Sequence, residues 1–254
     1  MEEQKKSILV IGATSGMGRE VAEIYIRRGY RVGITGRREH LLNEIKDKYP
    51  DAPVFARCVD VTSAGATEEI GTLINEMGGI DICLYSSGCG HTNTALSPSV
   101  ELEETSVNVN GYIRCSTFLF NYWSGQRRKG HLAVISSIAS VRPLGVAPGY
   151  SADKKFQAFY TEALRQLAVI RKADVAFTVI KPGFVDTDFI HGRRFPMTIS
   201  REKAAGLIVK AIDKRKRAVI IDRKWTALSV LMRLVPPRLW TSGGRFFRPY
   251  TDLF

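Results

Sequence analysis

Two side chains that could exchange a proton, those of Tyr150 and Lys154, stand four residues apart in a segment with helical apolar spacing. Residues four apart share one face of a helix, so we expect the phenol and the ammonium to be neighbours. A free phenol titrates near pH ~10, and an adjacent ammonium stabilises its deprotonated form. The pair is therefore a candidate acid/base, although the same spacing also occurs on ordinary helix surfaces.

Two polar residues upstream could complete this chemistry. Ser137 follows a predicted strand at its carboxyl end, where ligands bind in open α/β sheets, and its hydroxyl could bond a substrate oxygen. We expect its neighbour Ser136 to turn toward the fold. Asn108 is predicted within a helix, where asparagine is a mediocre former. A water linking a buried Asn108 to Lys154 would make a proton path.

A glycine-rich turn follows the first apolar run. It reads Gly12-Ala13-Thr14-Ser15-Gly16-Met17-Gly18, with the spacing GxxxGxG. Such a turn lets backbone amides and a helix N-terminus approach a pyrophosphate. We expect Gly12 to open the turn, Gly16 to admit a dinucleotide and Gly18 to allow close helix–strand packing. Glycine turns are common, but a position between the first strand and the first helix favours dinucleotide binding.

The second predicted strand ends in Gly36-Arg37-Arg38, where folds that select NAD carry an acid for the ribose hydroxyls. The guanidinium of Arg37 can pair with a 2′-phosphate, while Arg38 could stack on adenine or assist. NADP(H) is therefore favoured over NAD(H), the alternative being a solvated charged pair. Asp60 is expected to accept from the adenine amino group, or else to act as a helix N-cap. The backbone of Ser86–Gly90 is expected to run close to the cofactor ribose, or else to form a turn without ligand contact.

Short β-branched runs alternate with longer amphipathic segments. This pattern predicts a single-domain α/β Rossmann fold, a doubly wound, seven-stranded parallel sheet with helices on both faces. The predicted strands are Ser7–Ile11, Arg31–Thr35, Val54–Val59, Ile80–Tyr85, His131–Ile135, Val175–Ile180 and Ala218–Ile221. The predicted helices are Gly18–Arg28, Glu39–Lys48, Ala66–Glu76, Glu101–Trp123, Tyr150–Ala168 and Glu202–Lys214, the last with Ser200 as its N-cap.

Composition narrows the function classes. The 254 residues carry a net charge of +12, but the basic residues are scattered without an interleaved aromatic stripe, so no nucleic-acid partner is expected. The four cysteines form no CxxC pair and no zinc spacing, and no metal site is expected. The charged Met1–Ser7 segment resembles no secretory signal, and we find no apolar run of membrane-spanning length. A cytoplasmic location is expected.

Taken together, these motifs resemble the short-chain dehydrogenase/reductase family. The resemblance spans residues 7 to about 222, in family order. It rests on the glycine turn, Asp60, Ser87-Gly88, Asn108-xx-Gly111, Ser137, Tyr150-xxx-Lys154 and Pro182-Gly183-Phe184-Val185-Asp186-Thr187. Ser86-Ser87-Gly88 stands where the family usually has Asn-Ala-Gly, and Ile11 stands before Gly12 where a threonine is frequent. Neither departure removes a catalytic group.

The resemblance implies a catalytic tetrad of Asn108, Ser137, Tyr150 and Lys154. Tyr150 would exchange the proton, and Lys154 would also bind the nicotinamide ribose. Val185 and Thr187 would meet the nicotinamide carboxamide. The full set of expected cofactor contacts is Gly12, Thr14, Ser15, Gly16, Met17, Gly18, Arg37, Arg38, Asp60, Val61, Ser87, Gly88, Tyr150, Lys154, Pro182, Gly183, Val185 and Thr187. A homodimer or homotetramer is also implied.

The function that follows is hydride transfer between NADP(H) and a carbonyl or secondary alcohol. The alternative is a catalytically silent dinucleotide sensor or scaffold. Residues 188–200 are expected to form a substrate loop, with Phe189, Phe195 and Met197 as an apolar wall and Arg193 and Arg194 as an anion site. His91 and His191 are placed at its entrance. The apolar and basic residues 223–254 could touch a membrane surface, cover the pocket or join subunits, and they faintly resemble reductases of lipid-linked sugars.

Overall fold

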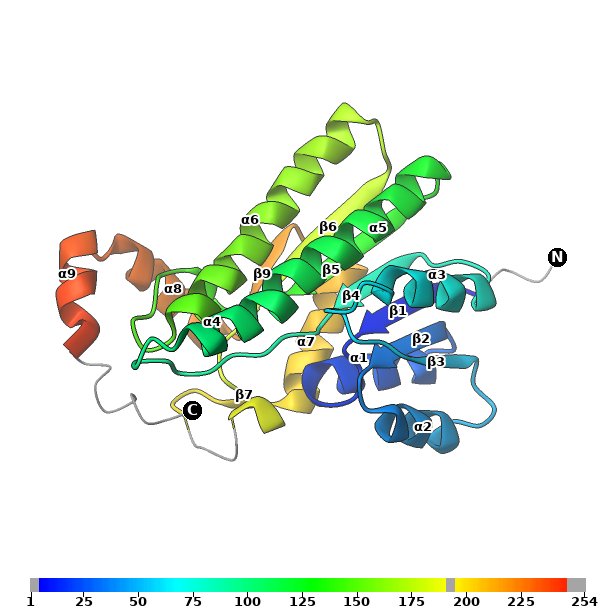
Figure 1. Cartoon of the computed structure of the whole chain (residues 1–254), viewed down its shortest axis with the longest axis horizontal. Coiled ribbons are helices and arrows are strands. Elements are labelled where there is room, and N and C mark those ends of the chain that lie inside the picture. The colour runs from blue at the N-terminus through cyan, green and yellow to red at the C-terminus, as the bar shows by residue number, and fades with distance from the viewer. Residues whose placement is uncertain (1–4, 191–194, 246–254) are drawn as a thin grey trace.

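A parallel sheet organises the chain (Figure 1). The structure, a computed structural model, describes residues 5–190 and 195–245. Within these residues seven strands pair in the order β3-β2-β1-β4-β5-β6-β9, all parallel. They are β1 (Ser7–Ile11), β2 (Arg31–Gly36), β3 (Val54–Cys58), β4 (Ile82–Tyr85), β5 (Gly130–Ile135), β6 (Val175–Pro182) and β9 (Ala218–Ile221). The doubly wound seven-stranded sheet predicted from the sequence is confirmed.

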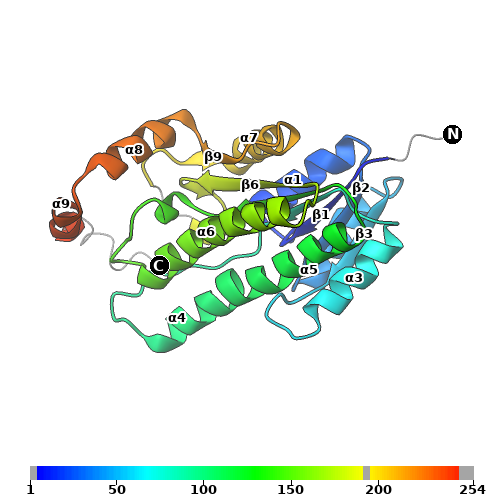
Figure 2. The ribbon, with the colours of Figure 1, turned by 90° about the horizontal axis from the view of Figure 1, so that it is seen from above.

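Helices cover both faces because the strands are apolar on both sides. In β1, Ile8 and Val10 pack into one core cluster while Leu9 and Ile11 pack into another, as the period of two requires. The first cluster is covered by α1 (Gly16–Arg27), α2 (Glu39–Lys48) and α7 (Arg201–Asp213). The second is covered by α3 (Ala66–Glu76), α5 (Tyr112–Gly125) and α6 (Pro148–Ile170). Figure 2 shows α5 and α6 side by side along one face.

The predicted helix Glu101–Trp123 is longer and less regular than expected. It runs as α4 (Pro98–Thr105), then a π-helical segment, η1 (Ser106–Gly111), and then α5. Asn108 lies within this π segment and is fully buried. The sequence signals the poor helix former but not the change in winding, because π segments are decided by tertiary contacts. The other predicted elements differ from the observed ones by at most two residues at either end.

Smaller elements complete the carboxyl-terminal half of the chain. A 3₁₀ turn, η2 (Ile138–Ser140), follows β5, and another, η3 (Asp188–Ile190), lies in the predicted substrate loop between β7 (Val185–Asp186) and β8 (Ile199–Ser200). The predicted N-cap is confirmed, since the Ser200 hydroxyl accepts from Lys203 N at 3.2 Å. Residues 223–242 form two helices that sequence reasoning left unassigned, α8 (Arg223–Leu234) and α9 (Pro237–Ser242). Among the described helices, none combines the length and hydropathy needed to cross a bilayer.

The contact between β1 and α1 depends on Gly18. A Cβ added there would lie 2.1 Å from the carbonyl oxygen of Gly12, so the helix approaches the strand end too closely for any side chain. Gly206 in α7 is a matched contrast, because a Cβ at that position meets nothing within 4 Å. Close packing at Gly18, expected from the sequence, therefore has a specific steric origin.

We predict that Gly18→Ala destabilises the protein by about 1–3 kcal/mol because the added methyl overpacks the turn. Gly206→Ala should instead stabilise it, by about 0.4–1 kcal/mol, because alanine restricts the unfolded chain. Urea unfolding of both variants and the wild type measures the difference. Equal stability of Gly18→Ala and the wild type would contradict the steric account.

Candidate active site

A cavity of about 690 Å³ lies at the carboxyl ends of the central strands. Eighteen of the twenty residues expected at the site line it. They are Gly12, Thr14, Ser15, Gly16, Met17, Arg37, Arg38, Asp60, Val61, Ser87, Gly88, Ser137, Tyr150, Lys154, Pro182, Gly183, Val185 and Thr187. The other two, Gly18 and Asn108, lie behind the wall and act through packing and hydrogen bonds.

The glycine turn forms one end of the cavity. Gly12 has a φ of +91°, and a Cβ there would lie 2.6 Å from Ser87 N, so this turn brings the ends of β1 and β4 together. Helix α1 begins at Gly16 directly after it. Ser15 at the N-cap makes no side-chain capping bond, and the first turn of α1 contains no acidic residue. These features fit the phosphates of a dinucleotide, which need backbone N–H donors and a positive helix end.

Two arginines follow β2 beside this turn. Arg38 does not lie free for an adenine: its Nη2 donates to Thr14 Oγ1 at 2.8 Å and to Ser15 Oγ at 2.7 Å. It therefore holds the glycine turn from outside. Arg37 also lines the cavity, and its side chain is exposed. Two exposed guanidinium groups, one of them hydrogen-bonded to the glycine turn, thus stand at this end of the cavity.

Asp60 follows β3 and lines the same end of the cavity. Its Oδ1 accepts from Thr62 N at 2.9 Å and from Thr62 Oγ1 at 2.8 Å. Burial raises the pKa of Asp60, but these hydrogen bonds and the charge of Arg37 outweigh it, so that the pKa is lowered overall. The alternative reading of Asp60 as a helix N-cap is wrong, because α3 begins at Ala66 with Gly65 as its cap.

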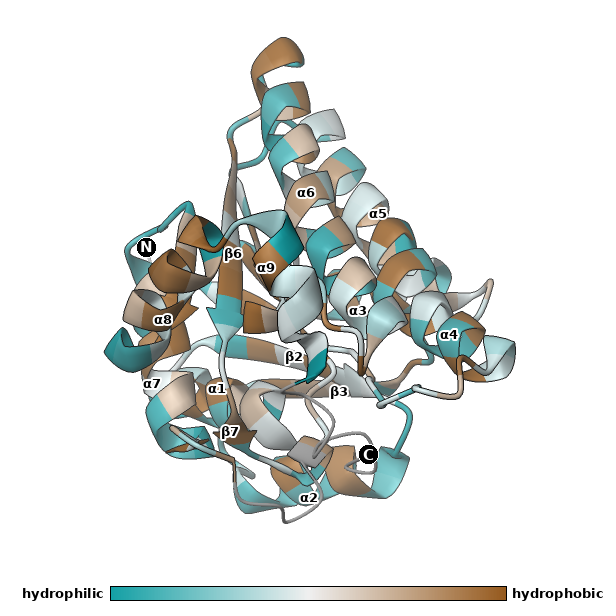
Figure 3. Cartoon of the chain, turned by 90° about the vertical axis from the view of Figure 1, so that its left-hand side faces the viewer, coloured by the Kyte–Doolittle hydropathy of each residue, from teal (hydrophilic) through white to brown (hydrophobic). Residues whose placement is uncertain are grey.

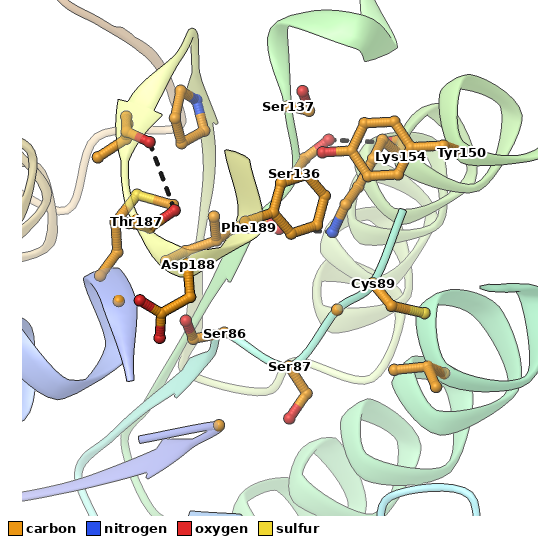
Figure 4. A pocket seen from close by; sticks show the side chains of 18 of the residues that line it. Ser86, Ser87, Cys89, Ser136, Ser137, Tyr150, Lys154, Thr187, Asp188 and Phe189 are labelled. Carbon is orange, nitrogen blue, oxygen red and sulfur yellow. Dashed lines mark hydrogen bonds between the residues drawn. The ribbon is translucent and has the colours of Figure 1, made fainter. Parts of the chain in front are cut away.

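Tyr150 and Lys154 face the cavity from the first turns of α6 (Figure 4). Lys154 Nζ lies 5.8 Å from the centroid of the Tyr150 ring. Burial raises the pKa of Tyr150 to about 12, while a hydrogen bond with Ser137 acts to lower it. Burial lowers the pKa of Lys154 to about 8. At neutral pH the phenol therefore keeps its proton, and the ammonium is close to its titration point.

The ammonium of Lys154 is held by groups from two elements. Its Nζ donates to Ile135 O at 3.2 Å and to Gln157 Oε1 at 3.1 Å. The other end of the same amide, Gln157 Nε2, donates to Asn108 O at 2.9 Å. The Gln157 side chain therefore links the Lys154 ammonium to the Asn108 carbonyl. Sequence reasoning missed Gln157, although its position three residues after Lys154 puts both on one helix face.

The side chain of Asn108 fixes the chain after β4. Its Nδ2 donates to Cys89 O at 2.8 Å, and its Oδ1 accepts from Cys89 N at 3.2 Å. Nδ2 also lies 3.3 Å from Asp153 Oδ2. A Cβ at Gly88 would lie 3.0 Å from Lys154 Nζ and 3.1 Å from Asn108 Oδ1. The segment Gly88-Cys89 is thereby clamped against the two polar side chains.

The two serines after β5 point in different directions. Ser136 Oγ donates to Lys154 O at 2.7 Å, inside the fold as expected. Ser137 lines the cavity, where its Oγ accepts from Ala139 N at 3.1 Å and acts to lower the pKa of the Tyr150 phenol. Ser137 and Tyr150 can therefore both reach one oxygen atom of a molecule in the cavity.

The end of the cavity beyond Tyr150 is apolar. The Phe189 ring lies 5.7 Å from the Tyr150 ring, and the rings of Phe184 and Phe195 stack at 4.2 Å. Phe189 and Phe195 line the cavity as expected. The wall residues that were not anticipated include Leu144, Val146 and Ala147, because the loop after β5 gave no pattern, and Phe184 after β6, to which no role was assigned.

Three expectations for this end need correction or lie outside the structure. Met197 is absent from the cavity wall, and its carbonyl instead accepts from Trp225 Nε1 at 3.3 Å. His91 also does not line the cavity, because its backbone N–H and ring bond the buried Glu104. His191, Arg193 and Arg194 lie outside the described residues.

Comparison with known proteins agrees with this geometry. Residues 6–195 match the family model for short chain dehydrogenases. An uncharacterized oxidoreductase of Myxococcus xanthus is 32% identical over 250 residues, covering 96% of this chain and 98% of that protein. The dehydrogenase/reductase SDR family member 7B of Bos taurus is 26% identical over 265 residues, covering 95% of this chain and 79% of its own length.

Solved structures share the fold. A short chain dehydrogenase/reductase from Burkholderia phymatum in complex with NAD superposes with a TM-score of 0.80 at 19% identity, covering 91% of this chain and 94% of that one. A short-chain dehydrogenase from Sphingobium yanoikuyae in complex with NADPH gives 0.75 at 19% identity, covering 91% and 97%.

The chain belongs to the short-chain dehydrogenase/reductase family. It is an oxidoreductase of that family, as the matching family model and the relatives described as oxidoreductases and dehydrogenase/reductases indicate.

Proposed function

We propose that the protein is an NADP(H)-dependent oxidoreductase that interconverts a carbonyl and a secondary alcohol. The observation that carries the proposal is one cavity with two different ends. A glycine turn and two arginines form one end, and the Tyr150 phenol beside the Lys154 ammonium stands at the other. A nicotinamide dinucleotide bound along it would supply or accept the hydride.

Each side chain then has a part in the proton transfer. Tyr150, protonated at neutral pH, donates its proton to the developing alkoxide in reduction, and its phenolate form accepts the proton in oxidation. Ser137 holds the substrate oxygen beside that phenol. Lys154 favours the phenolate form through its charge, with Asn108 fixing the wall behind it. Val185, Thr187, Pro182 and Gly183 would hold the nicotinamide end.

The preference for a 2′-phosphate rests on the chain's own arginines. Solved relatives carry NAD in one case and NADPH in another, so the fold does not decide the cofactor. Both arginines are exposed at the cavity edge, but the Arg38 guanidinium is engaged by Thr14 and Ser15, and we therefore assign the phosphate to Arg37. No acid stands at the end of β2 to repel the phosphate.

We predict that Arg37→Ala weakens NADPH binding by about tenfold to a hundredfold, the equivalent of one charged hydrogen bond. NADH binding should change little, because NADH lacks the phosphate. Fluorescence titration of both dinucleotides with the wild type and the variant measures the two affinities. An equal loss for NADH and NADPH would contradict the assignment of Arg37.

The substrate end favours an apolar carbonyl compound. Phe184, Phe189, Leu144 and Val146 line it, and we propose residues 188–200 as the loop that closes over substrate. A lipid-linked substrate is one member of this class. The alternative, a silent dinucleotide sensor or scaffold, has no use for a phenol beside a buried ammonium, and turnover separates the two functions.

We predict that Tyr150→Phe lowers the rate of carbonyl reduction by about 10²–10⁴-fold, because the proton donor is lost while the ring stays. NADPH affinity should be retained. A panel of apolar ketones and aldehydes, followed by NADPH absorbance, measures turnover. Half-buried Tyr122, altered to Phe, serves as the control because it lies on α5 and does not line the cavity. A wild type that binds NADPH but reduces no carbonyl would favour the sensor instead.

We further propose that α8 and α9 contact an anionic membrane surface, and that α4–α5 and α6 form a homodimer or homotetramer interface. Residues 223–242 contain four basic and no acidic side chains. Val230, Leu231, Leu234 and Leu239 are exposed apolar side chains on these two helices, which lie at one end of the molecule in Figure 1 and are coloured by hydropathy in Figure 3. Exposed Phe159, Val169 and Ile170 on α6 support the assembly. The cytoplasmic location stays a prediction.

We predict that the wild type co-sediments with vesicles of phosphatidylserine and phosphatidylcholine and less with phosphatidylcholine alone. L231E/L234E should abolish the binding, because it places acids on the apolar face. I170E, at the far end of α6, should leave vesicle binding intact but disturb assembly in light scattering. Vesicle binding that survives L231E/L234E would remove α8 from the proposed contact.

A further inference from the structure

The side chain of Gln157 stands between two groups that bear on the chemistry. It is fully buried, and its amide contacts the Lys154 ammonium with Oε1 and the Asn108 carbonyl with Nε2. The opposite orientation of the amide would set an NH₂ against the ammonium and an oxygen against the carbonyl, so the neighbours fix it. Both ends of the amide are used.

We propose that Gln157 is a positioning residue: its amide holds the Lys154 ammonium in the charged form beside Tyr150 and anchors the π-helical segment at Asn108. The proposal rests on the proposed function through the role of Lys154. It adds a residue to that site which contacts neither substrate nor dinucleotide, since Gln157 does not line the cavity.

The chemistry at this point requires an amide. The Lys154 ammonium needs an acceptor because it is 5% exposed and burial disfavours its charge. The Asn108 carbonyl needs a donor because it too is buried. Glutamine supplies both from one side chain, whereas an ionised carboxylate can only accept and an apolar side chain can do neither.

The acids near Lys154 do not replace this contact. Asp153 on α6, Glu104 on α4 and the Cys89 thiol after β4 all favour the charged lysine. Their own bonds go elsewhere: Asp153 accepts from Thr105 and Asn108, and Glu104 accepts from His91. Among the described residues, Lys154 Nζ donates hydrogen bonds only to Gln157 and Ile135. The neutral phenol of Tyr150 is the remaining titratable neighbour.

The test measures the pKa of Lys154 directly in the dinucleotide-free protein by NMR of lysine labelled with ¹³C at Cε. The Lys154 signal is assigned by its loss in Lys154→Arg. In Gln157→Met, which keeps the length of the side chain without its polar atoms, the pKa of Lys154 should fall by about one pH unit. In Gln157→Glu it should rise above the wild-type value, because a carboxylate favours the ammonium. Gln166→Met, an exposed change on the same helix, should leave it unmoved.

Opposite shifts in the two Gln157 variants support the proposal, since general damage to the fold would not reverse sign. A folded Gln157→Met protein with the wild-type pKa at Lys154 would overturn it. If Gln157→Met does not fold, Gln157→Glu decides, and an unchanged or lowered pKa there also overturns it. None of these readings uses turnover, so a failure of the proposed reaction would show separately in the carbonyl panel.

Discussion

A single buried ammonium constrains the rest of the site. Removing a charge from water is unfavourable unless other groups replace the hydration, and Lys154 is almost completely buried. The carbonyl of Ile135 at the end of β5 and the amide of Gln157 supply that replacement. The cost still shows in the lowered pKa of Lys154, to about 8. The protein can therefore bury this charge only if the end of β5 and the Gln157 side chain on α6 lie within hydrogen-bond distance of the ammonium. Gln157 in turn contacts the π-helical segment at Asn108.

The same burial separates the acid/base properties of two neighbours. Desolvation raises the pKa of the Tyr150 phenol to about 12, and the nearby Glu104 carboxylate and Cys89 thiol add to the rise. Burial has the opposite effect on the Lys154 ammonium and lowers its pKa. Without a dinucleotide, then, the phenol is a firmly protonated acid and the lysine a weakly held cation. The positive charge of an oxidised nicotinamide would favour the phenolate, which is the form that can accept a proton from an alcohol.

Much of this architecture could be predicted from the sequence, because it is encoded locally. Continuous apolar runs specify buried parallel strands, glycines mark the turn, and the four-residue spacing sets Tyr150 beside Lys154. What could not be predicted depends on long-range contacts. Asn108 in the π-helical segment bonds Gln157 and Cys89, which lie far from it in sequence, and the Arg38 guanidinium bonds the hydroxyls of Thr14 and Ser15. Helices α8 and α9 were missed since few of their side chains are buried, which weakens the apolar pattern.

The wall behind the chemistry explains why a glycine is needed away from the phosphate turn. At Gly88 a Cβ would press on both the Lys154 ammonium and the Asn108 side chain, so any larger residue would separate the segment after β4 from α6. That separation would break the paired bonds between Asn108 and Cys89, which keep the backbone against the cavity. Ser86 and Ser87 replace the Asn-Ala usual in the family, yet the glycine after them stays. The steric demand at Gly88 follows from its contact with the buried charge, whereas Ser86 and Ser87 lie against Gly18 and Gly12 of the glycine turn.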